Sequence, residues 1–219
     1  MLMNRDPLQN ENELLSRCSQ IEGLTLSQLA RQLQLIIPAD PLRRKGWAGQ
    51  AIELALGGSA GNQSIPDFHH LGIELKTLPI NHLGKPSEST YVTNIPLLTI
   101  HQEHWVSSQC YGKLKRVLWL PIEANKKLPF EHRRIGKAIL WSPSMQQYAI
   151  LEADWNEHVM MIATGKLAEI DASMGQYLQV RPKGANGKSL CYGYNDTGNK
   201  IRTLPRGFYL RATFTASIL

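Results

Sequence analysis

The stretch PDFHHLGIELKTLPI, residues 66–80, places two acids and a lysine in otherwise apolar surroundings. In its second half, apolar and polar residues alternate and branched residues are frequent, which predicts a β-strand. Side chains two residues apart on a strand point to the same face, so Glu74 and Lys76 share a face. Asp67 reaches the same end of the strand if the four residues before Ile73 form a turn. The segment therefore predicts two carboxylates and one ammonium group in a small volume.

This combination suits metal-dependent cleavage of a phosphodiester. Mg²⁺ prefers oxygen ligands and keeps several waters, so Asp67, Glu74 and the backbone carbonyl of Leu75 suffice to hold it. A divalent ion activates water and compensates the charge on phosphorus, while Lys76 would position or deprotonate that water. Glu53, on a helix close to its apolar side, is expected to contribute a further carboxylate. An exposed ion pair between Glu74 and Lys76 is the alternative, and the motif alone does not exclude it.

The basic character of the chain favours a polyanionic partner. Among 219 residues, 24 are Lys or Arg and 18 are Asp or Glu, which gives a net charge of +6 and an isoelectric point near 9.3. Four basic clusters with tyrosines between them suit a nucleic-acid groove better than one charged tail would, although each cluster alone can be a solvated face. The clusters are Arg43–Lys45, Lys113–Arg116, Arg133–Lys137 and Arg181–Lys188.

Composition also limits where the protein works. No apolar run is long enough for a membrane span, and the first thirteen residues do not resemble a secretory signal. The three cysteines, Cys18, Cys110 and Cys191, are scattered and odd in number, which is typical of thiols in a reducing compartment. We therefore expect a cytoplasmic protein without a membrane partner.

The order of predicted elements indicates a mixed α/β fold, in which helices flank a mixed sheet. Strands 71–80 and 90–98 are expected to form a hairpin, because the residues between them include Gly84 and Pro86. The other expected elements are helices over residues 11–36, 46–56 and 144–165, and strands over 115–122, 135–141, 177–181 and 208–211.

Six blocks of the sequence, in this order, resemble the MutH family of mismatch-repair endonucleases. They are RRKGWAGQAIELALGGSAGN, PDFHHLGIELKTLPI, KLKRVLWLPIE, LWSP, YLQVRPKGANGKSL and TLPRGFYL. The resemblance implies a restriction-endonuclease-like fold, with a central mixed β-sheet flanked by helices and two lobes around a DNA-binding cleft. It implies one domain over residues 1–219, whose N-terminal lobe carries the metal site and whose C-terminal lobe carries a DNA-reading loop.

The same resemblance implies an activity. A member of this family would use Mg²⁺ to nick the unmethylated strand of double-stranded DNA, 5′ to the G of a hemimethylated GATC site. It would act as a monomer, activated by MutL after MutS finds a mismatch, and Mn²⁺ or Ca²⁺ would substitute for Mg²⁺ in binding. Two alternatives remain open: a non-catalytic DNA-binding module, and a GATC restriction endonuclease that cuts both strands.

Roles for individual residues follow from the matching positions. Asp67 and Glu74 match the Mg²⁺ ligands, Lys76 the catalytic lysine and Glu53 a further acid. Arg181 and Lys183 suit guanine recognition in the major groove, although contacts with phosphates alone would bind DNA without reading it. The other DNA-binding positions that the resemblance implies are Lys45 and Lys113 on the DNA-facing side, Pro182 and Gly184 in the reading loop, Tyr209 as a sensor of adenine methylation, and Tyr91.

Overall fold

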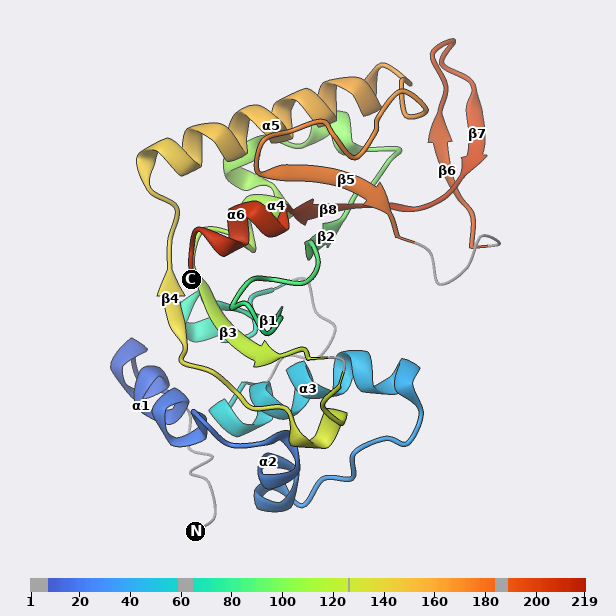
Figure 1. Ribbon diagram of the computed structural model, residues 1–219. Helices are drawn as coiled ribbons and strands as arrows, with labels where there is room; N and C mark the ends of the chain where they lie inside the picture. The colour runs from blue at the N-terminus through green and yellow to red at the C-terminus, as the bar shows by residue number, and fades with distance from the viewer. Residues whose placement is uncertain (1–7, 59–64, 126, 184–188) are drawn as a thin grey trace. The chain divides into compact units, whose positions relative to one another are not determined.

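The structure is a computed structural model that describes residues 8–58, 65–125, 127–183 and 189–219, without the side chain of Lys45 (Figure 1). The chain divides into two compact units. Unit 1 comprises Met1–Ser87 and Arg116–Ser142, and unit 2 comprises Glu88–Lys115 and Pro143–Leu219. Within the described residues, no helix combines the length and the apolar character needed to cross a lipid bilayer.

Three helices of unit 1 begin at polar caps. The Asn10 side chain accepts a hydrogen bond from the backbone of Glu13, and Thr25 forms a reciprocal capping box with Gln28. Asp40 caps the third helix, and the proline after it occupies the first helical position. This helix therefore begins earlier than expected. The helices are α1 (Glu11–Ile21), α2 (Leu26–Leu33) and α3 (Pro41–Leu56).

Unit 1 also contains a three-stranded mixed sheet of order β1-β3-β4, formed by β1 (Glu74–Ile80), β3 (Val117–Glu123) and β4 (Ile139–Trp141). Strand β1 pairs with β3 in parallel, whereas β4 pairs with β3 antiparallel. Leu118 and Leu120 of the central strand are fully buried in a core that includes residues of all three helices. Two short 3₁₀ turns, His69–Leu71 and Phe130–His132, complete the unit.

Unit 2 is built on an antiparallel sheet of order β2-β8-β5. Figure 1 shows the long helix α5 (Met145–Ala163) running beside β5. A second, two-stranded sheet follows β5 in the chain, formed by β6 (Cys191–Tyr194) and β7 (Lys200–Thr203). The other elements are β2 (Thr90–Asn94), β5 (Leu178–Pro182), β8 (Arg206–Leu210), α4 (Gln109–Gly112), α6 (Ala212–Ala216) and the 3₁₀ turns Ile100–Gln102 and Trp105–Ser107.

A buried carboxylate fixes the start of β5. Asp154 of α5 accepts backbone hydrogen bonds from Gln176, Tyr177 and Leu178 at 2.7–2.8 Å. Three such donors compensate a carboxylate that is only 6% exposed. The loop before β5 is thereby tied to the long helix, and β5 continues into the residues expected to read DNA.

The mixed α/β class is confirmed, and the strands of the described residues form three small sheets. The expected hairpin between strands 71–80 and 90–98 is wrong, because β1 pairs with β3 and β2 pairs with β8. The chain does reverse after β1, through a bridge between Ile80 and Pro86. Pro79 accepts a hydrogen bond from the Ser87 N–H but has no N–H to donate in return, so the ladder ends there. Strands β6 and β7 and helices α4 and α6 were not expected.

Candidate active site

The turn expected before β1 is present. Phe68 and Ile73 exchange both backbone hydrogen bonds, at 2.9 and 3.3 Å, and both side chains are buried. Residues His69–Leu71 form a 3₁₀ turn that ends at Gly72, whose φ of 66° is left-handed. Only glycine adopts that conformation without strain. The chain therefore folds back so that the residue before Phe68 lies beside the start of β1.

Asp67 is held against the backbone of β1. Its Oδ2 accepts a 2.8 Å hydrogen bond from the N–H of Leu75, the residue between Glu74 and Lys76. The N–H of Glu74 points the other way and donates to the carbonyl of Arg116. Successive residues of a strand direct their polar groups to opposite edges, so the Leu75 carbonyl lies on the same edge as Asp67. Two of the three expected metal-binding groups, the Asp67 carboxylate and the Leu75 carbonyl, thus lie on one edge of β1.

Glu74 and Lys76 form a buried ion pair. Lys76 Nζ lies 2.6 Å from Glu74 Oε1, and the exposed fractions of the two side chains are 13% and 4%. The exposed ion pair considered as an alternative is therefore wrong. Removing two charges from water offsets most of their mutual attraction, so such a pair is a poor source of stability. Charged pairs with this little exposure to water are often found at functional sites.

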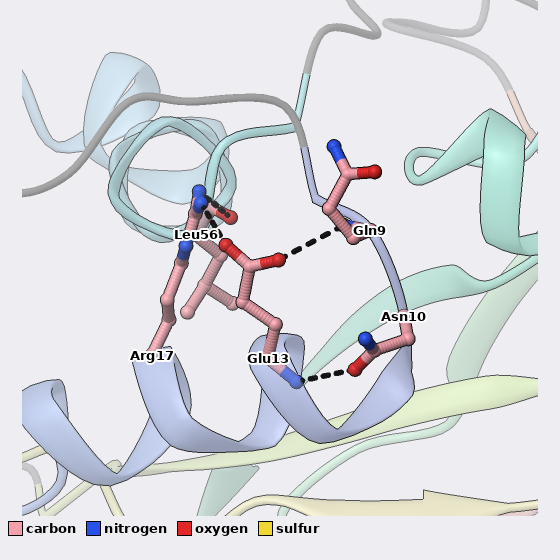
Figure 2. Close-up of polar contacts among 5 residues, drawn as sticks. All are labelled: Gln9, Asn10, Glu13, Arg17 and Leu56. Atoms are coloured by element: carbon pink, nitrogen blue, oxygen red, sulfur yellow. Dashed lines mark hydrogen bonds and ion pairs between the residues drawn. The ribbon is translucent and has the colours of Figure 1, made fainter.

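Glu53, the fourth expected catalytic residue, lies half-buried on the last turn of α3. Its side chain covers Gly58, since a Cβ built there would lie 2.5 Å from Glu53 Cγ. Figure 2 shows how α1 holds this end of α3: Arg17 donates to the Leu56 carbonyl at 3.2 Å and pairs with Glu13 at 2.7 Å. The helix end that carries Glu53 is therefore anchored by a buried guanidinium.

The donor set of unit 1 fits a hard divalent cation. Asp67 and Glu74 offer carboxylate oxygens, and Leu75 offers a backbone carbonyl on the same strand edge. Mg²⁺ is commonly bound through one or two carboxylates, with water and substrate phosphate as its other ligands. Across the described ranges, no three His, Cys, Asp or Glu side chains gather into a metal-binding group. Glu53 therefore does not join Asp67 and Glu74 in such a cluster. The protein would supply few of the ligands of a bound ion, and water and substrate would supply the others.

Four of the residues expected to bind DNA gather on unit 2. The rings of Tyr91 on β2 and Tyr209 on β8 meet edge to face, with centroids 5.4 Å apart. Lys183 Nζ lies 3.9 Å from the Tyr91 ring centre, and the Arg181 guanidinium lies 5.9 Å from that of Tyr209. Two cations thus lie over two rings that pack edge to face, which is an arrangement suited to phosphates and base edges. We call these four residues the reading cluster.

The phenol of Tyr209 has a pKa above its ordinary value. Burial raises its pKa, Arg181 opposes the rise and Glu88 adds to it. A neutral phenol keeps its O–H available as a donor. Tyr209 therefore combines a ring and a hydrogen-bond donor in a cluster that otherwise presents cations.

The sequence alone did not indicate three residues that support the reading cluster. Ser89 Oγ accepts from Gln179 Nε2 at 2.8 Å and from Arg181 Nη1 at 3.1 Å. Gly207 pairs with Arg181 across β5 and β8, and a Cβ there would lie 3.1 Å from the Tyr91 ring and 3.3 Å from the Tyr209 ring. Of these three residues, Gln179 could have been predicted from the sequence, because it lies two residues before Arg181 and therefore on the same face of the strand.

The remaining expected DNA-binding residues are placed less fully. Pro182 is exposed at the end of β5, and Lys113 is half-buried at the end of α4. Lys45 lies within α3 and not in the loop before it, because the helix already begins at Pro41. Gly184 lies outside the described residues.

Comparisons with known proteins point to one family. The family model described as "DNA mismatch repair enzyme MutH" matches residues 56–154. "DNA mismatch repair protein MutH" of Vibrio cholerae is 46% identical over 209 residues, which cover 95% of each chain. The proteins of the same name from Histophilus somni and Pasteurella multocida are each 49% identical, over 97% and 96% of this chain and 95% of their own.

Proposed function

The chain belongs to the MutH family of DNA mismatch-repair endonucleases, and from this premise we propose that it is a Mg²⁺-dependent enzyme that nicks hemimethylated GATC sites. It would cut the unmethylated strand 5′ to the G. We further propose that MutL activates it after MutS finds a mismatch, and that it acts as a monomer in the cytoplasm. Identity close to half over nearly the full chain supports carrying these family properties over.

Unit 1 supplies the hydrolytic groups in this proposal. Asp67, Glu74 and the Leu75 carbonyl would hold the divalent ion, which when bound supplies an activated water and charge compensation at phosphorus. Lys76 would position the attacking water and offset the negative charge that develops at phosphorus, because the ion pair with Glu74 holds its ammonium group beside the proposed ion site. Glu53 would act from α3 as a further acid of the active site that is not among the ligands of the ion. The single observation that carries the proposal is the buried Glu74–Lys76 pair beside Asp67.

Unit 2 supplies sequence recognition. Arg181 and Lys183 would bind guanine edges in the major groove, and Pro182 and Gly184 would shape the loop that enters it. A methyl group on adenine N6 projects into the same groove, where the Tyr209 ring would sense it and Tyr91 would pack beside it. Lys45 and Lys113 would bind phosphates. The cation–aromatic contacts among Tyr91, Tyr209, Arg181 and Lys183 support this role.

The decisive experiment compares cleavage of three end-labelled duplexes that differ only in adenine methylation at a single GATC. With Mg²⁺, we expect nicking of the unmethylated strand in the hemimethylated duplex and none of the fully methylated duplex. Addition of MutL and ATP should accelerate the nicking. A duplex with GATC changed to GTAC controls for sequence choice.

Each alternative has a distinct outcome. Binding of every duplex without cleavage would identify a non-catalytic module and contradict the proposal. Cleavage of both strands of the unmethylated duplex at equal rates would identify a restriction endonuclease. Acceleration that requires MutL but persists with GTAC would contradict the assigned sequence choice.

A further inference from the structure

The hairpin formed by β6 and β7 has one face made of two tyrosines and two cations. Tyr192 pairs across the strands with Arg202, and Tyr194 with Lys200. Directly opposed residues share a face of a two-stranded sheet, and residues two apart share it too. Tyr192 is 51% and Tyr194 39% exposed, and both cations are exposed. We call these four residues the hairpin face.

The opposite face of this hairpin packs against its own unit. A Cβ built on Gly193 would lie 3.4 Å from the Thr203 side chain and 3.6 Å from that of Leu97. Gly193 is buried and Ile201 is half-buried. One face is therefore fixed to the segment after β2, and the hairpin face is left for a partner.

The hairpin face is also internally ordered. Lys200 Nζ lies 4.4 Å from the centre of the Tyr192 ring, so the ring holds the ammonium group over the strands. At the tip, Asn195 Oδ1 accepts from the Asn199 N–H at 2.7 Å and from Thr197 Oγ1 at 2.9 Å. The acid near the tip, Asp196, lies in this turn and not on either strand. Lys200 and Arg202 thus extend from a hairpin whose turn is held by side-chain hydrogen bonds.

The hairpin leaves the main sheet of unit 2 at the reading cluster. The N–H of Lys183 donates a 2.7 Å hydrogen bond to the carbonyl of Pro205, which lies just before β8. This hydrogen bond brings Lys183 and Pro205 together at the base of the hairpin. Both strands, β6 and β7, lie between these two residues in the chain. Figure 1 shows β6 and β7 beyond the ends of β5 and β8. The hairpin and the reading cluster are therefore joined at Lys183 within one unit.

We propose that the hairpin face is a second DNA-contacting surface, which binds backbone phosphates of the duplex that flanks the recognition site. Lys200 and Arg202 bind one phosphate each, and the hydroxyls of Tyr192 and Tyr194 donate to phosphate oxygens. Charge complementarity selects this occupant, because phosphates are regularly spaced anions and the face carries two cations and no acid. Contacts of this kind add affinity without adding sequence choice. The inference rests on the proposed function only in requiring that unit 2 binds duplex DNA.

The test is the salt dependence of binding to a long duplex with one central GATC, measured by fluorescence anisotropy in Ca²⁺ for the full chain. Each phosphate contact contributes about 0.9 to the slope of log affinity against log salt, so Lys200→Ala/Arg202→Ala should lower the slope by about 1.8. Its affinity deficit should shrink about tenfold between about 50 and about 200 mM salt. The deficit should be the same with GTAC in place of GATC.

Two controls isolate the local contact. Lys200→Arg/Arg202→Lys keeps both charges on the hairpin and should keep the wild-type slope. Arg31→Ala/Lys127→Ala removes two exposed cations of unit 1 and should leave the slope unchanged. Circular dichroism of each variant checks that it folds.

The outcomes separate this inference from the proposed function. A wild-type slope in Lys200→Ala/Arg202→Ala, with wild-type binding intact, would overturn the hairpin face alone. An equal fall in slope for Arg31→Ala/Lys127→Ala would overturn it also, since net charge would then be the cause. If the wild-type chain binds no duplex, both proposals fall.

Discussion

The N–H of Leu75 donates a 2.8 Å hydrogen bond to Oδ2 of Asp67, eight residues earlier in the chain. The bond places the Asp67 carboxylate beside the backbone of β1, where Glu74 and Lys76 form their buried pair. Asp67 therefore has two separable properties: it accepts a structural hydrogen bond and it carries a negative charge. Substitutions can remove one without the other.

Asp67→Asn should abolish cleavage with little effect on folding. The asparagine carbonyl still accepts from Leu75, whereas the charge that would hold a divalent ion is lost. Loss of one charge-stabilising group in a hydrolytic site lowers the rate by about 10²–10³-fold. Single-turnover nicking of hemimethylated GATC measures the rate, and anisotropy without divalent ions should give wild-type DNA affinity. Near-wild-type nicking would mean that Asp67 serves only the turn.

Gly72→Ala should lower both stability and activity. A left-handed conformation costs a non-glycine residue about 1–2 kcal/mol, and Gly72 ends the turn that delivers Asp67. Gly84→Ala is the matched control, because Gly84 has a φ of 74°, equally open space around it, and a place in the turn after β1. Urea unfolding should show similar losses for both variants, while only Gly72→Ala should slow nicking. Equal activities would contradict the role of the turn.

Ser89→Ala should blunt the preference for GATC. Ser89 holds the exposed Arg181 guanidinium through a 3.1 Å hydrogen bond, and losing a typical intramolecular hydrogen bond corresponds to about 1 kcal/mol, roughly fivefold in discrimination. The measurement is the ratio of nicking rates on GATC and GTAC duplexes. Ser107→Ala, which removes an exposed side-chain bond to a backbone carbonyl of unit 2, is the control. An unchanged ratio in Ser89→Ala would show that Arg181 needs no such support.

Glu11 should make the stability of unit 1 depend on acid pH. Arg116 Nε donates a 2.9 Å hydrogen bond to Glu11 Oε1. This bond lowers the pKa of Glu11 below the ordinary value of 4.5. The stabilisation is therefore present above pH 4.5 and is lost as pH falls through the lowered pKa. Glu11→Gln should reduce the free energy of unfolding by about 0.5–1 kcal/mol at neutral pH, because the pair is partly exposed.

Urea unfolding at neutral and acid pH checks this dependence. The difference between Glu11→Gln and wild type should vanish in acid. Glu22→Gln, at the opposite end of α1, is the control and should not destabilise, since an acid is unfavourable at a helix C-terminus. A pH-independent deficit in Glu11→Gln would point to packing and not to charge.

Local chemistry made the site of unit 1 predictable from the sequence. The alternation after Leu71 placed Glu74 and Lys76 on one face, and the turn on which the approach of Asp67 was made to depend is present and ends at Gly72. The burial of the pair could not be foreseen, because it depends on strands and helices distant in the sequence. The same holds for the Arg17 contact with the Leu56 carbonyl, which joins residues 39 apart.

Strand pairing was the part that local patterns predicted worst. A turn after β1 suggested a hairpin, yet Pro79 cannot donate to the returning segment, and β1 pairs with β3. The support of Arg181 by Ser89 was missed for a related reason, since the two residues are 92 apart and meet only when β5 and β2 join β8 in one sheet. The short strands β6 and β7 carry too few apolar residues to show a clear period.

The most direct test of the account is the Mg²⁺ dependence of single-turnover nicking by the wild type and by Glu74→Gln. The wild type should be inactive in chelator and should saturate with Mg²⁺. Glu74→Gln should need more Mg²⁺ and should remain slower at saturation, because one of two carboxylate ligands is lost. Cleavage that persists in chelator, or a Glu74→Gln curve that overlies the wild type, would contradict the claim that Asp67 and Glu74 hold the catalytic ion.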